Sequence, residues 1–328
     1  MATVLQGNKV ASDRASDFEP GYLRLHRSGE LAGRARQARE RMKDCDLCPR
    51  YCHVNRLDTI RGAVCRTGKH AVVHSFGPHH GEEHCLKGWN GSGTIFFSWC
   101  SLRCIFCQNW EISWQGHGEE RPADDLAAIM LRLQKAGCHN INFVTPSHVV
   151  AQILEAVAIA AEGGLKLPLV FNTSGYDSLE ALALLDGVID IFMPDMKFGD
   201  SERAHRHSHV REYAKYNQAA VKEMHRQVGD LVIGDDGLAR RGLLVRHLVL
   251  PDNISATDKV LKFIAEEIST KTVVNIMDQY RPCHRAADAP ELDRRITERE
   301  FEEAHAAARR YGLSHLEAPF PRDLFSVR

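Results

Sequence analysis

The chain has 328 residues, long enough to bury a substantial core as one large domain with an appendage or as two domains. Its 42 basic and 43 acidic side chains nearly cancel, which excludes binding to nucleic acid or membranes through bulk charge but is compatible with a local basic patch. The first residues lack a signal-peptide pattern, and no stretch of about 18 uncharged apolar residues could span a bilayer. We therefore expect a cytoplasmic protein, with no indication of a membrane or nucleic-acid partner.

Residues 1–43 are polar and charged, and they predict a surface arm with a helix over residues 30–42. Residues 44–92 are rich in Cys, Gly, His and Arg and contain few long apolar runs. This composition indicates a small loop-rich unit that something other than a hydrophobic core holds together. The chain has ten cysteines, and clustered cysteines in a reducing compartment are more often metal ligands or catalytic groups than disulfides.

Four of the five cysteines within residues 44–92 form a spaced set. Cys45, Cys48, Cys52 and Cys65 have the spacing C-x2-C-x3-C-x12-C. Four thiolates make a closed site, which suits either zinc or a structural or electron-relay [4Fe-4S] cluster. Binding would help this segment fold, because metal-binding free energy is folding free energy where no core exists. We therefore expect a second metal site in this Cys-rich N-terminal unit.

From residue 93 to residue 328, short apolar runs alternate with helical patterns in six β-then-α units. Nearly continuous apolar strands separated by amphipathic helices predict an α/β fold with a parallel sheet covered by helices. This pattern alone does not distinguish a barrel-like sheet from a doubly wound one. Strands are expected at residues 93–98, 140–144, 167–171, 189–193, 243–250 and 272–277, and helices at residues 122–136, 149–161, 178–185, 212–226, 259–268 and 300–311.

Polar residues stand at the ends of these strands, and both arrangements of a parallel sheet place function in the loops there. Six such loops together favour one functional mouth, although Thr145, Ser147 or Ser174 taken singly would also suit helix N-caps. The strand-end residues are Cys100–Cys107, Thr145–His148, Asn172–Gly175, Asp195 with Lys197, Arg246 with His247, and Asp278–Arg281.

The first of these loops carries Cys100, Cys104 and Cys107 at the spacing C-x3-C-x2-C. Three thiols on one short loop can ligate a single cubane cluster, and a soft thiolate set suits iron-sulfur chemistry. The fourth iron would have no cysteine nearby in sequence, and an open metal position is where a substrate or cofactor binds. A zinc knuckle that borrows a distant ligand is the alternative interpretation of the same residues.

Two further patterns have plainer interpretations. Cys138, in the turn before the second strand, is expected to be a small buried apolar residue. The run from His205 to His209 has no helical spacing that would aim all three of its imidazoles inward. We therefore expect a solvated loop there.

The C-x3-C-x2-C spacing, Phe106 before the third cysteine and the preceding strand GTIFFS resemble the signature of radical S-adenosylmethionine (radical SAM) enzymes. A larger set of motifs resembles the pyruvate formate-lyase-activating-enzyme-like group, or PflX-type iron-sulfur proteins, over residues 22–316. These motifs are CDLCPRYCHVNR, FSWCSLRCIFCQNWEIS, HNINFVTPSHV, NTSGYDS, MPDMKF, VRHLVLP and MDQYRP.

The resemblance implies a partial (β/α)6 TIM-like barrel in which S-adenosylmethionine binds the open iron of a [4Fe-4S] cluster. An electron then cleaves S-adenosylmethionine to give a 5′-deoxyadenosyl radical, and this radical abstracts hydrogen from an unidentified substrate. That substrate is a glycyl-radical enzyme in one version and a small molecule, a peptide or another macromolecule in others. The resemblance also implies an electron donor such as flavodoxin or ferredoxin. A non-catalytic metal-binding interaction protein is the alternative from another class.

The resemblance also assigns roles to the strand ends. Relatives hold the amino group of S-adenosylmethionine with a Gly-Gly-Glu run after the second strand, whereas this chain has Thr145–His148, whose hydroxyl oxygens can accept the same group. Asp195 and Lys197 match an Asp-x-Lys motif, and Arg246 matches a residue that pairs with the cofactor's carboxylate; a structural ion-pair network is the alternative for these three. The catalytic iron ligands are then Cys100, Cys104 and Cys107, and the cofactor contacts are Phe106, Thr145, Ser147, His148, Asn172, Thr173, Ser174, Asp195, Lys197, Arg246 and Gln279.

Overall fold

The computed structural model describes residues 18–317, so the predictions for residues 1–17 and 318–328 lie outside the described residues. Six parallel strands form the centre of the fold, in the order β2-β4-β5-β6-β8-β9. Each pairs with the next of the six along the chain, without the reversal of order that defines a doubly wound sheet. The order therefore identifies a barrel-like sheet. Its strands are β2 (Ser92–Phe97), β4 (Ile141–Val144), β5 (Leu169–Thr173), β6 (Ile191–Pro194), β8 (Ala239–Leu248) and β9 (Val273–Met277).

Three antiparallel strands make the sheet mixed. β1 pairs with β2, β3 pairs with β1, and β7 pairs with β8. None of the described strands joins β9 back to β2, so the barrel is partial. Because β1 runs opposite to β2, its last residue, His79, lies beside Ser92 at the start of β2. These strands are β1 (Ala71–His79), β3 (Glu119–Arg121) and β7 (Val232–Ile233).

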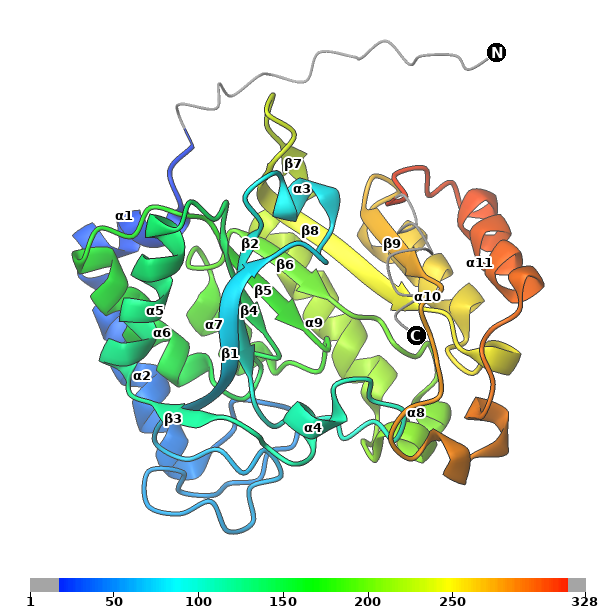
Figure 1. Ribbon diagram of the computed structural model, residues 1–328, viewed down its shortest axis with the longest axis horizontal. Helices are drawn as coiled ribbons and strands as arrows, with labels where there is room; N and C mark the ends of the chain where they lie inside the picture. The colour runs from blue at the N-terminus through cyan, green and yellow to red at the C-terminus, as the bar shows by residue number, and fades with distance from the viewer. Residues whose placement is uncertain (1–17, 318–328) are drawn as a thin grey trace.

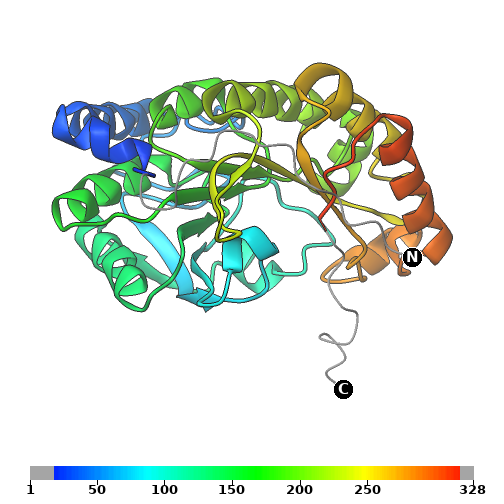
Figure 2. The same cartoon turned by 90° about the horizontal axis from the view of Figure 1, so that it is seen from above.

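The helices that connect the parallel strands form an outer layer around the sheet (Figures 1 and 2). Local signals fix their ends: Ser178 caps α7 through a bond from the Ala181 amide, and Thr297 and Glu300 form a capping box on α11. Within residues 18–317, no helix combines the length and apolar character needed to cross a bilayer. The outer helices are α5 (Ala123–Lys135), α6 (Val150–Glu162), α7 (Leu179–Leu185), α9 (Tyr213–Val228), α10 (Thr257–Phe263), which continues as a π-turn (Ile264–Ile268), and α11 (Glu298–Arg310).

The described part of the predicted surface arm, residues 18–43, packs against the barrel, so that prediction is wrong for these residues. Residues 30–41 are helical as expected, but α1 (Gly21–Arg27) and α2 (Glu30–Arg41) pack against α6 and join the main core. Tyr22 is fully buried, and its hydroxyl donates to the Leu167 carbonyl at 3.1 Å. A narrow stripe of small apolar side chains on α2 is enough to bury one face, although the rest of the helix is charged.

The Cys-rich segment, defined here as residues 44–70, is loop-rich as predicted, with only one turn of 3-10 helix (Met42–Asp44) at its start. The rest of the predicted unit belongs to the barrel instead. After β1 the chain forms α3 (His84–Lys87), whose Cys85 and Leu86 pack against Val170, Ile191, Met193 and Leu244 of the parallel strands. Because β1 ends beside the start of β2, α3 covers the end of the barrel opposite the strand-end loops.

The prediction of a solvated loop at His205–His209 is wrong. Ser201–Ser208 form α8, capped by the Asp200 carboxylate, and His207 is buried against the ring of Phe198. The cap and the first-turn Glu202 were the sequence signals for this helix. The remaining short elements are α4 (Trp110–Ser113) and 3-10 turns at Pro251–Asn253, Ala286–Asp288 and Pro290–Leu292.

One buried arginine joins the Cys-rich segment to the barrel. Arg56 is 2% exposed and donates to the carbonyls of Thr67 and His148 at 2.7 Å each, and to the Cys45 sulfur at 3.4 Å. His148 lies in the connection from β4 to α6, so the Arg56 side chain joins both parts of the molecule. A buried guanidinium has a high desolvation cost unless all its partners are present.

We expect Arg56→Ala to lower the free energy of unfolding by about 2–4 kcal/mol, because it leaves two buried carbonyls without donors. Urea unfolding at pH 7 would measure the loss. Arg61→Ala is the matched control, since it removes an exposed arginine from the same segment and should change stability by no more than about 0.5 kcal/mol. Equal losses in the two variants would contradict the role given to Arg56.

Candidate active site

A cavity of about 340 Å³ lies at the carboxyl ends of the parallel strands. The loops after five of the parallel strands and the end of β8 contribute to its walls, as the strand-end pattern predicted. The structure brings all three cysteines of the C-x3-C-x2-C motif and most of the predicted cofactor contacts to this one cavity. Those lining residues are Cys100, Cys104, Cys107, Phe106, Thr145, Asn172, Thr173, Ser174, Asp195, Lys197, Arg246 and Gln279.

Two predicted contacts, Ser147 and His148, do not line the cavity. The Ser147 hydroxyl lies 2.9 Å from that of Thr173, which itself donates to the Asp177 carboxylate at 2.6 Å. His148 is buried beside the Ser98 carbonyl, and this burial lowers its pKa to about 3. Both side chains therefore support the loops behind the cavity wall. Burial likewise raises the pKa of Asp177 to about 6.

The thiol loop, residues 100–107, follows β2 and is tightly turned. Trp99 and Arg103 adopt left-handed backbone angles, with φ values of 67° and 71°. The Leu102 amide donates to the Cys100 sulfur at 3.4 Å, and the Ser113 hydroxyl donates to the Cys107 sulfur at 3.1 Å. Such donors stabilise sulfur atoms that carry negative charge.

The chemistry of these donors fits an iron-sulfur cluster. Burial raises the pKa of Cys104 to about 12, so a free thiolate is disfavoured there, whereas a bound metal would hold the sulfur deprotonated. Among residues 18–317, no three His, Cys, Asp or Glu side chains surround a position for a single metal ion. Three thiols of one loop that line an open cavity would suit a cubane, whose fourth iron stays free for a cofactor.

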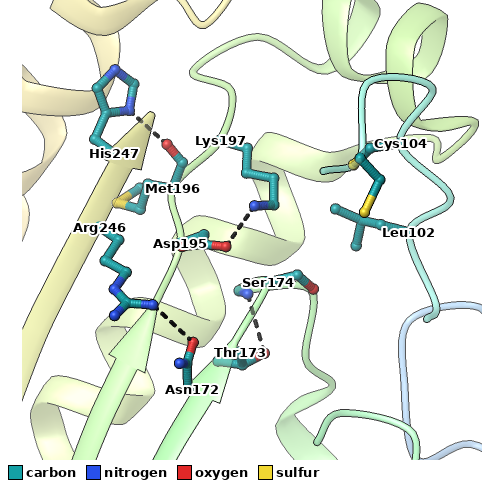
Figure 3. Close-up of polar contacts among 12 residues, drawn as sticks. Leu102, Cys104, Asn172, Thr173, Ser174, Asp195, Met196, Lys197, Arg246 and His247 are labelled. Atoms are coloured by element: carbon teal, nitrogen blue, oxygen red, sulfur yellow. Dashed lines mark hydrogen bonds and ion pairs between the residues drawn. The ribbon is translucent and has the colours of Figure 1, made fainter. Parts of the chain in front are cut away.

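Asp195 and Lys197 face the thiol loop across the cavity (Figure 3). The Lys197 ammonium donates to the Asp195 carboxylate at 2.5 Å, and both side chains are about four-fifths buried. Burial alone would lower the pKa of Lys197, but Asp195 and the sulfurs of Cys104 and Cys107 raise it above its ordinary range. A permanent positive charge therefore stands opposite the thiols.

Helix α9 holds this pair in place with two side chains that the sequence analysis did not predict. The Tyr213 hydroxyl donates to the Ser174 carbonyl at 2.9 Å and accepts from the Lys197 amide at 3.1 Å. Asn217 donates to the carbonyls of Gly175 and Asp195. Polar residues four apart on one face of an otherwise amphipathic helix were the available signal.

Arg246 is held by two carboxylates that the sequence did not single out. Its guanidinium makes a two-pronged pair with Glu83 at 2.7 Å and also contacts Glu82, while Asn275 donates to Glu83 at 2.8 Å. Only its third nitrogen turns toward Asn172, at 3.4 Å (Figure 3). This arrangement is the structural ion-pair network that we held as the alternative for Arg246.

Glu82 and Glu83 come from the turn between β1 and α3, so the element that covers one end of the barrel also supplies the floor of the cavity. Glu83 is fully buried. Burial alone would raise the pKa of Glu83, but Arg246 and Asn275 outweigh it and lower that pKa below its ordinary value of 4.5. Nothing in the local sequence, which lies outside the β-then-α pattern, indicated that these carboxylates reach the barrel interior.

The second set of cysteines lies around Arg56 and does not line the cavity. Burial raises the pKa of Cys48 to about 12. Cys45 has a lowered pKa of about 5, first because Cys52 donates to its sulfur and then because Arg56 lies beside it. A metal at this set stays a prediction.

The family follows from comparison with known proteins. The family model of the Radical SAM superfamily matches residues 94–278, more than half of the chain. An uncharacterized protein of Methanocaldococcus jannaschii is 33% identical over 285 residues, which cover 84% of this chain and 77% of that protein. This chain belongs to the Radical SAM superfamily. Membership of the pyruvate formate-lyase-activating-enzyme-like subgroup stays a prediction.

The solved structures are less similar to this chain than the protein of Methanocaldococcus jannaschii is. A radical SAM methyltransferase from Sphaerobacter thermophilus is 14% identical, with a TM-score of 0.46 over 69% of this chain and 66% of its own. Methylornithine synthase (PylB) is also 14% identical, with a TM-score of 0.45 over 68% of this chain and 63% of its own. Neither TM-score reaches 0.5, so the reactions of these two proteins carry no argument about this chain.

Glu83, in the floor of the cavity, should make the free energy of unfolding depend on pH. Because the pKa of Glu83 is lower in the folded chain than in the unfolded chain, its stabilisation is present above about pH 4.5 and is lost as the pH falls through the folded value. We expect Glu83→Gln to be less stable than the wild type at pH 7 by about 2–4 kcal/mol, and to lose less further stability between pH 5 and pH 3.

Urea unfolding at several pH values would measure both effects. Glu120→Gln, at an exposed position on β3, serves as the control and should follow the wild type. Parallel acid dependence of the wild type and Glu83→Gln would show that Glu83 does not carry this titration.

Proposed function

We propose that this enzyme reductively cleaves S-adenosylmethionine at a [4Fe-4S] cluster held by Cys100, Cys104 and Cys107, and that the resulting 5′-deoxyadenosyl radical abstracts hydrogen from a substrate. The observation that carries the proposal is that three thiols of one loop line the same cavity as the buried Asp195–Lys197 pair. A purely structural metal site would not need an open cavity lined by polar strand ends. Membership of the Radical SAM superfamily supports the same reaction.

When bound, the cluster and S-adenosylmethionine supply the electron-transfer and radical chemistry, and the protein orients them and excludes water. Phe106 packs edge-on against Phe198 and Tyr280, which makes the wall behind the thiols apolar. On the opposite wall, the Lys197 ammonium would pair with a carboxylate, and the oxygens of Asn172 and Thr173 would accept from amino or hydroxyl groups.

We propose that the substrate that loses the hydrogen atom is a small molecule or an extended peptide segment. A cavity of about 340 Å³ is near the lower end of the range for ligand pockets, and it must also hold the cofactor. A glycine in a peptide loop of a partner protein fits this space, as does a small molecule. The motif resemblance to activating enzymes supports the glycine, and a protein substrate would then be a glycyl-radical enzyme.

We expect the wild type, reconstituted anaerobically with iron and sulfide and reduced with dithionite, to convert S-adenosylmethionine into 5′-deoxyadenosine and methionine. Cys104→Ala should reduce both products to background, because it removes one of three ligands from the site. Liquid chromatography of the reaction would measure the products, and iron analysis would measure cluster content.

Cys138→Ala is the matched control, since Cys138 is as buried as Cys104 but does not line the cavity. It should cleave S-adenosylmethionine at the wild-type rate. Cleavage by Cys104→Ala would overturn the cluster assignment. A wild type with full iron content and no cleavage would favour the non-catalytic alternative.

We also propose a second [4Fe-4S] cluster at Cys45, Cys48, Cys52 and Cys65. Arg56 is buried among these thiols without a carboxylate partner in the described chain, and a buried guanidinium requires an anionic partner. Four cysteinates that hold a cluster would supply this anionic partner. All ten cysteines are unpaired, which supports a reducing compartment such as the cytoplasm.

Two clusters would give about eight iron atoms per reconstituted chain. We expect replacement of Cys48 and Cys65 by alanine to lower this to about four and to lower the melting temperature, while the iron held by the thiol loop remains. Metal analysis that finds zinc in place of iron, or about four iron atoms in the wild type, would refute the second cluster.

A further inference from the structure

A second concave surface lies on the outside of the thiol loop. It is an open groove of about 780 Å³ between the Cys-rich segment and the end of α8, and we call it the basic groove. Figure 1 draws the Cys-rich segment, in blue, on the same side of the molecule as α4 and α8. The groove is lined by Arg50, Ile60, Arg61, Gly62, Ala63, Val64, Arg66, Arg103, Trp114 and His209.

Four guanidinium groups line this groove, and no carboxylate does. Arg50 donates to the carbonyls of Ser101, Leu102 and His209, and Arg103 donates to those of Val64, Ser113 and Trp114. These bonds orient the two side chains without neutralising them. Arg61 and Arg66 are exposed, and neither forms an ion pair with any residue of the described range. The groove therefore presents positive charge that the protein leaves uncompensated.

The groove shares a wall with the candidate active site. Arg103 lies between Cys100 and Cys104 in sequence and lines both the groove and the cavity. The Trp114 indole nitrogen donates to the Cys104 carbonyl at 3.1 Å. A molecule seated in the groove would therefore be separated from the three thiols by the thickness of one loop, without entering the cavity where S-adenosylmethionine is proposed to bind.

The aromatic rings beside the groove argue against a nucleic acid as its occupant. Single-stranded nucleic acids stack their bases on free aromatic faces. Here the guanidinium carbons of Arg66 and Arg103 lie 5.1 Å and 5.3 Å from the ring centre of Trp99. Trp114 lies 5.4 Å from the Arg103 guanidinium carbon and 4.8 Å from the His284 ring. These rings already pack against the protein's own side chains.

We propose that the basic groove docks an acidic one-electron carrier protein of the flavodoxin or ferredoxin class, an inference that rests on the proposed function. Each reductive cleavage of S-adenosylmethionine needs one electron, and an outside carrier must supply it at least once. The carrier is oxidised by one electron, and that electron reduces the sulfonium, breaking one carbon–sulfur bond to give methionine and the 5′-deoxyadenosyl radical. Opposite charge at the surface nearest the thiol loop steers such a carrier to the site where its electron is used.

Binding tests the docking surface without requiring turnover. We expect the reconstituted protein to bind a purified oxidised bacterial flavodoxin or ferredoxin in a calorimetric titration, more weakly at 200 mM than at 50 mM salt. The double variant Arg61→Glu with Arg66→Glu should bind the carrier at least tenfold more weakly. The control, Arg36→Glu with Arg299→Glu, changes net charge equally at two exposed positions on α2 and α11 and should bind like the wild type.

Measuring cleavage of S-adenosylmethionine with two different reductants distinguishes a loss of carrier docking from a loss of catalysis. Cleavage of S-adenosylmethionine driven by the reduced carrier should fall about tenfold in the Arg61/Arg66 variant, while cleavage driven by dithionite stays within twofold of the wild type. Neither residue lines the active-site cavity, so a loss with both reductants would overturn the assignment.

Equal carrier binding by the groove and control variants would also overturn the docking proposal, as would groove-dependent binding of a single-stranded RNA oligonucleotide in place of either carrier. An absence of dithionite-driven cleavage in the wild type would refute the proposed function. The two failures are therefore distinguishable.

Discussion

Hydrogen bonds from other segments to its backbone hold the thiol loop in place, and the site depends on these contacts. Arg50 of the Cys-rich segment donates to the carbonyls of Ser101 and Leu102, and Trp114 donates to that of Cys104. The Ile105 amide donates to the His207 carbonyl of α8, while its carbonyl accepts from the Arg285 amide. A tight loop with left-handed residues cannot satisfy its own backbone groups, so segments distant in sequence satisfy them.

Paired charges then set the electrostatics inside the cavity. Lys197 with Asp195, and Arg246 with Glu82 and Glu83, are ion pairs withdrawn from bulk water, where each charge is stable only with its partner present. Tyr213 and Asn217 fix the backbone beneath Asp195, which limits how far the first pair can relax. Such fixed charges and dipoles need little reorganisation when a charged cofactor binds, and that is the property a catalytic site requires.

The six β-then-α units were predictable because buried parallel strands and amphipathic helices leave strong periodic patterns. Strand-end position was enough to bring Asn172, Asp195 and Lys197 to one cavity. Glu83 was not predictable, because β1 lies outside the repeating pattern and its turn enters the barrel from the opposite end. Ser147 and His148 show a second limit: a polar side chain after a strand can point behind the cavity wall and stabilise the loop from there.

The segment between α2 and β2 is therefore part of the site and not an appendage to it. It supplies the floor through Glu83 and the clamp on the thiol loop through Arg50. Arg103 lies between the two sets of cysteines: burial and the charge of Arg66 lower its pKa, and the sulfurs of Cys100 and Cys65 act in the opposite direction. Because Arg56 fixes the Cys-rich segment to the barrel and Arg50 fixes the thiol loop to that segment, anything that orders Cys45–Cys65 also orders the loop. Folding of the Cys-rich segment and ordering of the thiol loop are therefore coupled through these two arginines.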